Sequence, residues 1–180
     1  MELKALQDFE AYSEVPEETV SKYKGRIPEQ FIGIWKEYGF GSFLGGYFKL
    51  INPDDFLDFT QKSYFEKSAI PLLATALGDI IVWEGNEYLV LLAYRYGNFD
   101  CLEYGCDFFL NDLSDNKYVE RHFKNTNFYI SLKILGKPAY DECFGYVPLL
   151  SLGGSEKPEN LQKVKLREHL EIMYQVQGGI

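Results

Sequence analysis

Two histidines and three cysteines are the residues of this 180-residue chain whose types could support nucleophilic or metal chemistry. Cys101 and Cys106 stand too far apart for the C-x-x-C spacing of a zinc knuckle or a redox pair, and Cys143 is remote from both. An odd cysteine count without a compact pattern also argues against a disulfide framework. We therefore expect no metal site, and we interpret the cysteines as small buried apolar residues.

The two histidines do not form a recognisable catalytic group. His122 and His169 would each need a nucleophile and an orienting acid, and the sequence contains no G-x-S-x-G or other nucleophile motif. His169 shares its predicted helix face with Ile172 and Met173, which favours a core or boundary histidine over a general base. We expect no catalytic residues, no cofactor and no enzymatic activity.

Two glycine clusters could suggest phosphate binding. Gly39, Gly41, Gly45 and Gly46 follow a predicted helix and precede a predicted strand, whereas the dinucleotide fingerprint requires the opposite order. The second cluster, at residues 152–155 (LGGS), lacks the Lys-Ser/Thr pair that follows the glycines of a P-loop. Both clusters are therefore interpreted as turns.

Asp54 and Asp55 could act as paired carboxylates, but their position predicts a structural role. Asn52 is a typical helix N-cap, and Pro53 suits the first position of a helix. The two acids then lie in the positive first turn of that helix, where they stabilise it. The segment predicts a helix start and carries no catalytic signature.

The composition excludes a disordered chain and a membrane-spanning chain. Hydrophobic residues make up 46% and aromatic residues 17% of the sequence. No stretch approaches the ~20 apolar residues that span a bilayer. The beginning of the sequence lacks the apolar region of a secretory signal, so we expect a cytoplasmic protein.

The net charge is −9, and it is unevenly distributed along the chain. Residues 1–120 carry 10 basic and 21 acidic side chains, whereas residues 121–180 carry 8 basic and 6 acidic ones. An acidic protein repels phosphate backbones, so we expect no direct nucleic-acid partner. A basic protein partner would instead be attracted to the acidic part.

The pattern of apolar residues, prolines and glycines predicts one α+β domain. Helices are expected over residues 16–24, 28–38, 53–65, 107–113, 115–122, 126–135 and 158–176. Strands are expected over residues 47–51, 70–76, 79–84, 87–94 and 99–104. Tight turns between these strands favour an antiparallel β meander, which we expect to pack between N-terminal and C-terminal helices, with Trp35 in the core.

The segment that follows the predicted meander combines aromatic and acidic residues. Aromatic side chains supply much of the energy of protein interfaces, and acidic side chains would attract a basic partner. For any single aromatic residue here, a place in the core is the alternative interpretation. The candidate partner-binding residues are Glu103, Tyr104, Asp107, Phe108, Asp112 and Asp115.

Several motifs are similar to those of known bacterial families. Residues 23–28 (YKGRIP), 35–39 (WKEYG) and 47–56 (YFKLINPDDF) resemble the GAD-like domain, as does the strand pair at residues 76–83 (ALGDIIVW). Residues 146–154 (YVPLLSLGG) resemble the C-terminal module of type VI secretion immunity proteins. The opening helix also has a looser likeness to the SUKH immunity superfamily.

The resemblance implies a cytoplasmic immunity protein that binds and neutralises a cognate bacterial toxin, often a nuclease, without enzymatic activity. On this basis we expect a GAD-like region over residues 1–100 and a helical immunity-type region over residues 101–180, in one continuous unit. The expected partner is a basic toxin domain, bound by a monomer or weak dimer that has no membrane partner. The alternative is a regulatory module that binds a small molecule or a peptide without catalysis.

Overall fold

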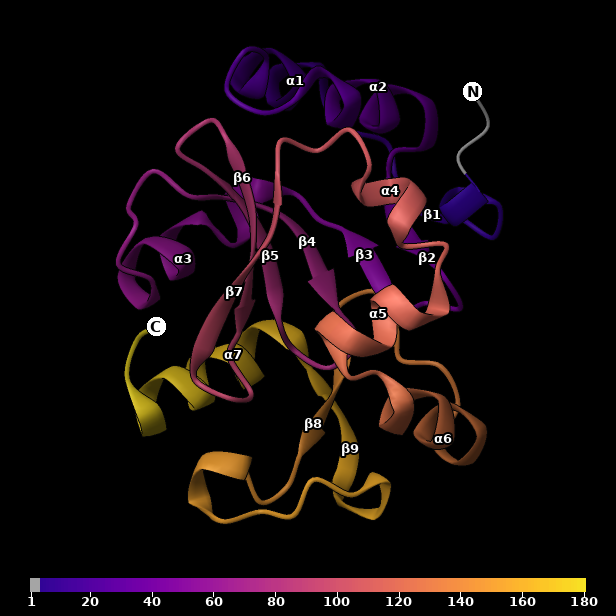
Figure 1. Ribbon diagram of the computed structural model, residues 1–180, viewed down its shortest axis with the longest axis vertical. Coiled ribbons are helices and arrows are strands. Elements are labelled where there is room, and N and C mark those ends of the chain that lie inside the picture. The colour runs from indigo at the N-terminus through magenta and orange to yellow at the C-terminus, as the bar shows by residue number, and fades with distance from the viewer. Residues whose placement is uncertain (1–3) are drawn as a thin grey trace.

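A seven-stranded antiparallel sheet runs through the computed structural model, which describes residues 4–180 (Figure 1). Its strands follow one another in chain order, so the sheet is a meander, as predicted. A separate hairpin pairs β8 (Glu142–Tyr146) with β9 (Leu161–Lys165). The strands of the sheet are β1 (Glu10–Ser13), β2 (Phe40–Phe43), β3 (Phe48–Leu50), β4 (Ile70–Thr75), β5 (Ile80–Glu84), β6 (Tyr88–Ala93) and β7 (Asn98–Tyr104).

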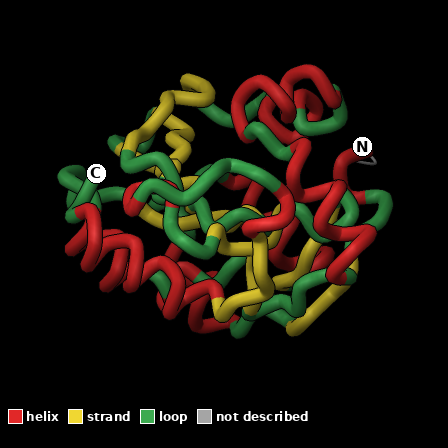
Figure 2. Tube along the Cα trace, turned by 90° about the horizontal axis from the view of Figure 1, so that it is seen from below, coloured by secondary structure: helices red, strands yellow, loops and turns green. Residues whose placement is uncertain are grey.

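Helices lie on several sides of the strands, some of which reach the edge of the molecule (Figure 2). The predicted α+β class is therefore confirmed. Within residues 4–180, no helix is long and apolar enough to cross a membrane. The α-helices are α1 (Glu17–Tyr23), α2 (Glu29–Tyr38), α3 (Leu57–Ser63), α4 (Phe109–Asp112), α5 (Asn116–Phe123), α6 (Thr126–Leu135) and α7 (Leu166–Gln177). Short 3₁₀ turns occupy Lys4–Leu6, Pro53–Asp55, Leu150–Leu152 and Pro158–Asn160.

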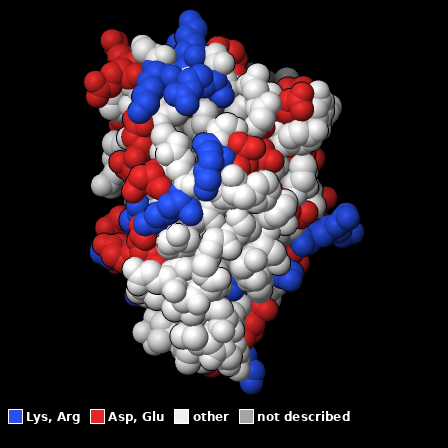
Figure 3. Space-filling model, turned by 90° about the vertical axis from the view of Figure 1, so that its left-hand side faces the viewer, with Lys and Arg blue, Asp and Glu red and all other residues white. Residues whose placement is uncertain are grey.

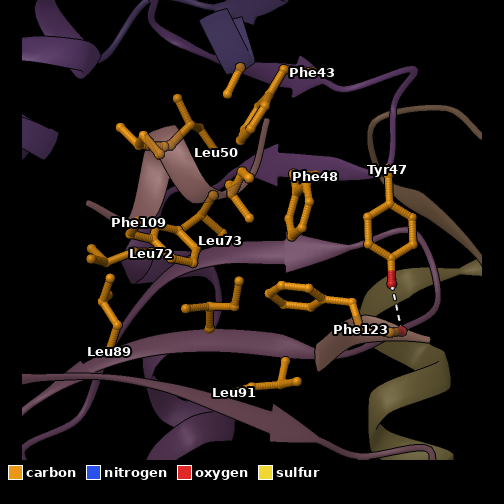
Figure 4. Packing of buried hydrophobic residues seen from close by; sticks show 14 of the residues in the cluster. Phe43, Tyr47, Phe48, Leu50, Leu72, Leu73, Leu89, Leu91, Phe109 and Phe123 are labelled. Carbon is orange, nitrogen blue, oxygen red and sulfur yellow. Dashed lines mark hydrogen bonds between the residues drawn. The ribbon is translucent and has the colours of Figure 1, made fainter. Parts of the chain in front are cut away.

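The sheet buries apolar side chains on both faces, because successive residues of a strand point to opposite sides. Leu89 and Leu91 of β6 belong to the larger core, together with residues of α2, α4 and α5. Val90 and Leu92 belong to the smaller core, together with residues of α3 and α7. In Figure 4 the ring of Phe123, at the end of α5, lies over the sheet in the larger core. The meander is thus packed between helices, as predicted.

Local sequence signals fix several element ends where they are predicted. Gly39 ends α2 with a φ of 79°, a conformation that favours glycine, and its N–H donates to the Trp35 carbonyl at 3.0 Å. The Asn52 side chain accepts a hydrogen bond from the Asp54 N–H at 3.1 Å and caps the turn that begins at Pro53. Trp35 is 1% exposed, which confirms its predicted place in the core.

Two predicted segments are wrong because strand pairing overrides the local pattern. Phe40–Phe43, inside the glycine cluster interpreted as a turn, forms β2 between β1 and β3. Residues 158–165, predicted to begin the last helix, form a 3₁₀ turn and β9, since β9 pairs with β8 in antiparallel register. A strand hairpin therefore lies in the C-terminal region that the sequence predicts to be helical.

The three cysteines differ in exposure. Cys106 and Cys143 are buried, as predicted, but Cys101 is exposed on β7. Burial raises the pKa of the Cys106 thiol to about 11 and that of Cys143 to about 12, so both thiols stay protonated at neutral pH. The prediction of a buried Cys101 is wrong because β7 is the last strand of the sheet.

The β8–β9 hairpin is tied to the sheet by several hydrogen bonds. The Phe144 N–H donates to the Ala76 carbonyl at 2.7 Å, and the Tyr140 hydroxyl donates to the Leu50 carbonyl at 2.7 Å. Lys49 of β3 is buried, and its ammonium group donates to three backbone carbonyls in the turn before β8. Because Phe144 also belongs to the larger core, the hairpin and the sheet share buried side chains.

Candidate partner-binding surface

The six candidate residues lie at the end of β7 and along the two helices that follow it (Figure 1). They are close in the chain, but they have two different roles in the structure. Two of them cap helices, and the other four only expose their side chains to solvent. Glu103 and Tyr104 end β7, Asp107 and Phe108 precede α4, Asp112 ends α4, and Asp115 precedes α5.

Two of the four candidate carboxylates accept hydrogen bonds at the start of a helix. Glu103 Oε1 accepts a hydrogen bond from the Phe108 N–H at 3.1 Å, at the start of α4. Partial burial raises the pKa of Glu103, and the negative charges of Asp112 and Asp107 add to that rise. Asp115 is the N-cap of α5, and its Oδ1 accepts the N–H two residues later at 2.9 Å. Both carboxylates therefore stabilise the local fold, a role that the sequence alone does not assign to them.

The other four candidates present their side chains to solvent. Tyr104 is 71% exposed and Phe108 is 67% exposed. Asp107 and Asp112 are also exposed, and neither has an ion-pair partner within residues 4–180. Exposed aromatic rings and unpaired carboxylates thus occur together between β7 and α5, a combination typical of an interface with a basic protein.

Further exposed aromatic residues surround β7, and two of them, Phe65 and Tyr88, come from other segments of the chain. The ring centroids of Phe65 and Phe99 lie 5.4 Å apart, and those of Tyr88 and Tyr104 lie 5.5 Å apart. Phe65 follows α3 and is remote from β7 in the chain, so only the fold brings it to Phe99. The aromatic surface therefore extends from α4 along the open side of β7.

His122 of α5 pairs with Asp100 of β7, and its Nδ1 atom lies 3.2 Å from Asp100 Oδ2. The Tyr118 ring lies 4.6 Å from the imidazole, measured between ring centroids. A carboxylate in this position can orient a general base. Among the residues that the structure describes, however, no hydroxyl or thiol is hydrogen-bonded to His122. The pair joins α5 to the edge of the sheet.

His169 is buried on α7 against two glycines, which confirms the predicted core position. A Cβ atom at Gly145 would overlap the imidazole ring, and one at Gly78 would touch it. Burial lowers the pKa of His169 to about 4, so the ring is neutral at neutral pH. The close approach of these glycines shows that His169 fills space in the core.

Asp79 and Arg95 form a buried ion pair that the sequence analysis does not find. Arg95 Nε lies 3.0 Å from Asp79 Oδ2, and both side chains are almost completely buried. Complete burial raises the pKa of Asp79, and the Arg95 cation opposes that rise. Arg95 also donates to the Phe123 carbonyl, which accepts the Tyr47 hydroxyl at 3.1 Å as well. These groups fasten the end of α5 to the sheet, and Figure 4 shows the hydrogen bond between Tyr47 and Phe123.

A small cavity lies beside this ion pair. Its volume is about 10 Å³, and Leu77, Arg95, Tyr146 and His169 are among the residues that line it. A volume of this size holds roughly one water molecule. Arg95 Nη1 has no hydrogen-bond partner in the described part of the chain, so a water molecule would satisfy it. Within residues 4–180, no three His, Cys, Asp or Glu side chains are grouped to hold a metal ion.

The chain is similar to two family models and to a solved structure. Residues 1–93 match the GAD-like domain, and residues 104–177 match the T6SS immunity protein Tdi1, C-terminal. The crystal structure of Atu4351 from Agrobacterium tumefaciens has a TM-score of 0.78 and 20% sequence identity, and covers 97% of this chain and 88% of that chain. At this identity the likeness shows the fold alone. No curated protein matches the chain.

Proposed function

This chain belongs to the GAD-like domain family, and on that premise we propose that it binds a cognate bacterial toxin and neutralises it by occlusion. The match of residues 104–177 to a type VI secretion immunity domain supports an immunity role and implies a toxin partner. This match is the observation that carries the proposal. We propose that the protein acts by binding alone, without catalysis.

In this proposal the toxin docks on the segment from Glu103 to Asp115. Tyr104 and Phe108 would supply aromatic contact area, and Asp107 and Asp112 would supply unpaired negative charge. Support comes from the exposure of these side chains and from their position within the residues that match the immunity domain. Glu103 and Asp115 would add charge while they cap their helices.

The proposed toxin is basic, and a nuclease is its proposed class. Nucleases need positive charge to hold phosphate groups, and such charge would be attracted to residues 1–120, where 21 acidic side chains outnumber 10 basic ones. We propose action in the cytoplasm as a monomer or weak dimer, without direct contact to nucleic acid or membrane.

The alternative, a regulatory module for a small molecule or a peptide, has weaker support. The cavity beside Arg95 is too small for a metabolite. An open hollow of about 660 Å³ between β1 and the helices α1 and α2 is lined by Glu14, Glu17 and Glu37, among others, and would suit a basic peptide. That hollow lies outside the residues that match the immunity domain.

The test is co-purification with the product of the neighbouring gene, followed by a protection assay in cells that express that product. Tyr104→Ala combined with Phe108→Ala should weaken the complex about tenfold or more, since truncated aromatic anchors dominate interface energies. Ile134→Ala is the matched control, because Ile134 is equally exposed but lies on α6. Absence of binding would contradict the proposed function, and binding unaffected by the double substitution would contradict the proposed surface.

A further inference from the structure

β7 is an edge strand with an open outer side. It pairs with β6 on one side, and no strand of residues 4–180 pairs with its other side. The Gly105 N–H donates to the Glu87 carbonyl at 2.6 Å, which makes Tyr88 and Tyr104 a non-hydrogen-bonded pair. In such a pair the N–H and C=O of Tyr104 point away from β6. The backbone of β7 therefore offers hydrogen-bonding groups to a further strand.

The two edges of the sheet differ in length and in what lies beside them. Natural edge strands are kept short, interrupted by bulges, or guarded by lysine, proline or a covering loop. β1 has four residues and a register shift, and although its residues are exposed, Glu10 and Tyr12 contact Lys137 and Tyr140 of a neighbouring loop. β7 has seven residues and contains neither lysine nor proline; its register is regular from Asn98 to Cys101 and shifts once at Leu102, before Glu103.

Aromatic side chains flank the open edge on the face that carries α3. Phe99 is 49% exposed, and its ring lies 5.8 Å from that of Tyr64 and 5.4 Å from that of Phe65, measured between centroids. Phe65 and Tyr104 are exposed on the same side of the sheet edge. Aromatic rings in this position can pack against the side chains of a strand that pairs with β7.

The charged residues near β7 indicate which kind of strand could pair with its open edge. Asp100 lies on β7, and Glu84 lies on the nearby strand β5. Partial burial raises the pKa of the exposed Cys101 thiol, and the negative charges of Asp100 and Glu84 raise it further, as expected beside two carboxylates. A second copy of this chain, paired two-fold along β7 with its axis within one residue of Asp100, would set its own Asp100 opposite or diagonal to Asp100 here. Like charges across strands are destabilising, which favours a basic occupant.

We propose that an extended, basic segment of the toxin adds to the sheet as a strand along the outer edge of β7. Main-chain hydrogen bonds to β7 would hold this segment, while Phe65 and Phe99 would contact its side chains and Asp100 would attract its cations. Figure 3 shows the side of the molecule that lies to the left in Figure 1, where Lys and Arg side chains stand among Asp and Glu side chains. The inference rests on the proposed function, because it specifies how the toxin is held.

The test measures hydrogen–deuterium exchange of the full chain, alone and with the polypeptide encoded by the neighbouring gene. Strand addition should slow exchange across residues 98–104, and Phe99→Ala should weaken the complex about tenfold, with Ile134→Ala as the matched control. Tyr104→Pro removes the outward N–H as well as the ring, so it should weaken the complex more than Tyr104→Ala does. Thermal unfolding checks that each variant is folded.

Three outcomes would overturn the proposal. A complex that leaves exchange across residues 98–104 unchanged would refute strand addition and leave the proposed function standing. Equal affinities for folded Tyr104→Pro and Tyr104→Ala would have the same meaning. Concentration-dependent protection of residues 98–104 in the protein alone would assign the edge to a second copy. Failure of the neighbouring product to bind at all would instead count against the proposed function.

Discussion

Lys49 offers a direct test of how much a buried, hydrogen-bonded ammonium group contributes to the stability of the fold. Its side chain is 1% exposed, and Nζ donates to the carbonyls of Ala139 at 2.9 Å and Tyr140 at 3.0 Å, and to the carbonyl of Glu142. Lys49→Met keeps the aliphatic stem but leaves three carbonyls without this donor. An unsatisfied buried polar group costs about 1–3 kcal/mol, and the cost of burying the charge is removed, so we expect a net loss of roughly 2–4 kcal/mol near pH 7.

The pH dependence of that loss follows from the pKa of Lys49. Burial lowers this pKa from 10.5 to about 8. Between these values the unfolded chain holds a proton that the folded protein has released, so the stability contributed by Lys49 rises with pH. The difference in unfolding free energy between wild type and Lys49→Met should therefore widen by about 2 kcal/mol from near pH 7 to near pH 9.5. Tyrosines and cysteines also titrate in alkali, but their contributions to the unfolding free energy are the same in both proteins and cancel in this difference.

The assay is urea unfolding of both proteins at the two pH values. Lys133→Met is the matched control, because Lys133 is exposed on α6 and its removal should shift stability equally at both. A difference between wild type and Lys49→Met that stays constant with pH would show that the ammonium is solvated. That result would refute the lowered pKa of Lys49, whereas a loss of less than about 1 kcal/mol for Lys49→Met near pH 7 would refute the inference that its hydrogen bonds fasten β3 to the start of β8.

Four further predictions concern stability, chemistry and recognition. Trp35→Ala should lower the unfolding free energy by about 3–5 kcal/mol in urea unfolding, since the indole is buried. The folded-state pKa of His169, about 4, lies below its unfolded value of 6.5, so the stability advantage of wild type over His169→Gln should shrink by up to about 3 kcal/mol from pH 6.5 to pH 4 in urea titrations. His122→Gln should keep full protection in the toxin assay, because its pairing with Asp100 is structural. Asp107→Lys combined with Asp112→Lys should slow toxin association in stopped-flow measurements at low salt. Glu159→Lys should leave the association rate unchanged.

Helix ends are predictable from the sequence where proline and glycine fix them. Gly39 ends α2 at the predicted position, because its φ of 79° favours glycine. Gly41 is predicted to lie in a turn, but it lies in strand β2. A Cβ atom there would overlap the Phe9 ring and the Glu10 carbonyl, so this glycine admits the neighbouring β1 strand instead of making a turn. Since β1 is exposed along its whole length, it carries no apolar alternation that could reveal it.

The candidate site is predictable only as far as its residues are neighbours in the chain. The sequence indicates an aromatic and acidic segment around Tyr104 and Phe108, and both side chains are exposed. It does not indicate that Phe65 meets Phe99, because these residues belong to different elements and meet only when α3 packs beside β7. The sequence also does not predict that Glu103 caps α4, because this contact depends on how the chain turns between β7 and α4.

Acidic side chains and an open strand edge should act on different steps of binding. Charges on Asp107 and Asp112 act over about 8 Å at physiological ionic strength, so they raise the rate at which a basic toxin arrives. Main-chain pairing along β7 acts only at contact, so it sets how long the complex lasts. Charge reversal should therefore lower the association rate and depend on salt, whereas Phe99→Ala should raise the dissociation rate at any salt concentration. If both substitutions changed only the dissociation rate, Asp107 and Asp112 would belong to the contact itself and would not steer the toxin.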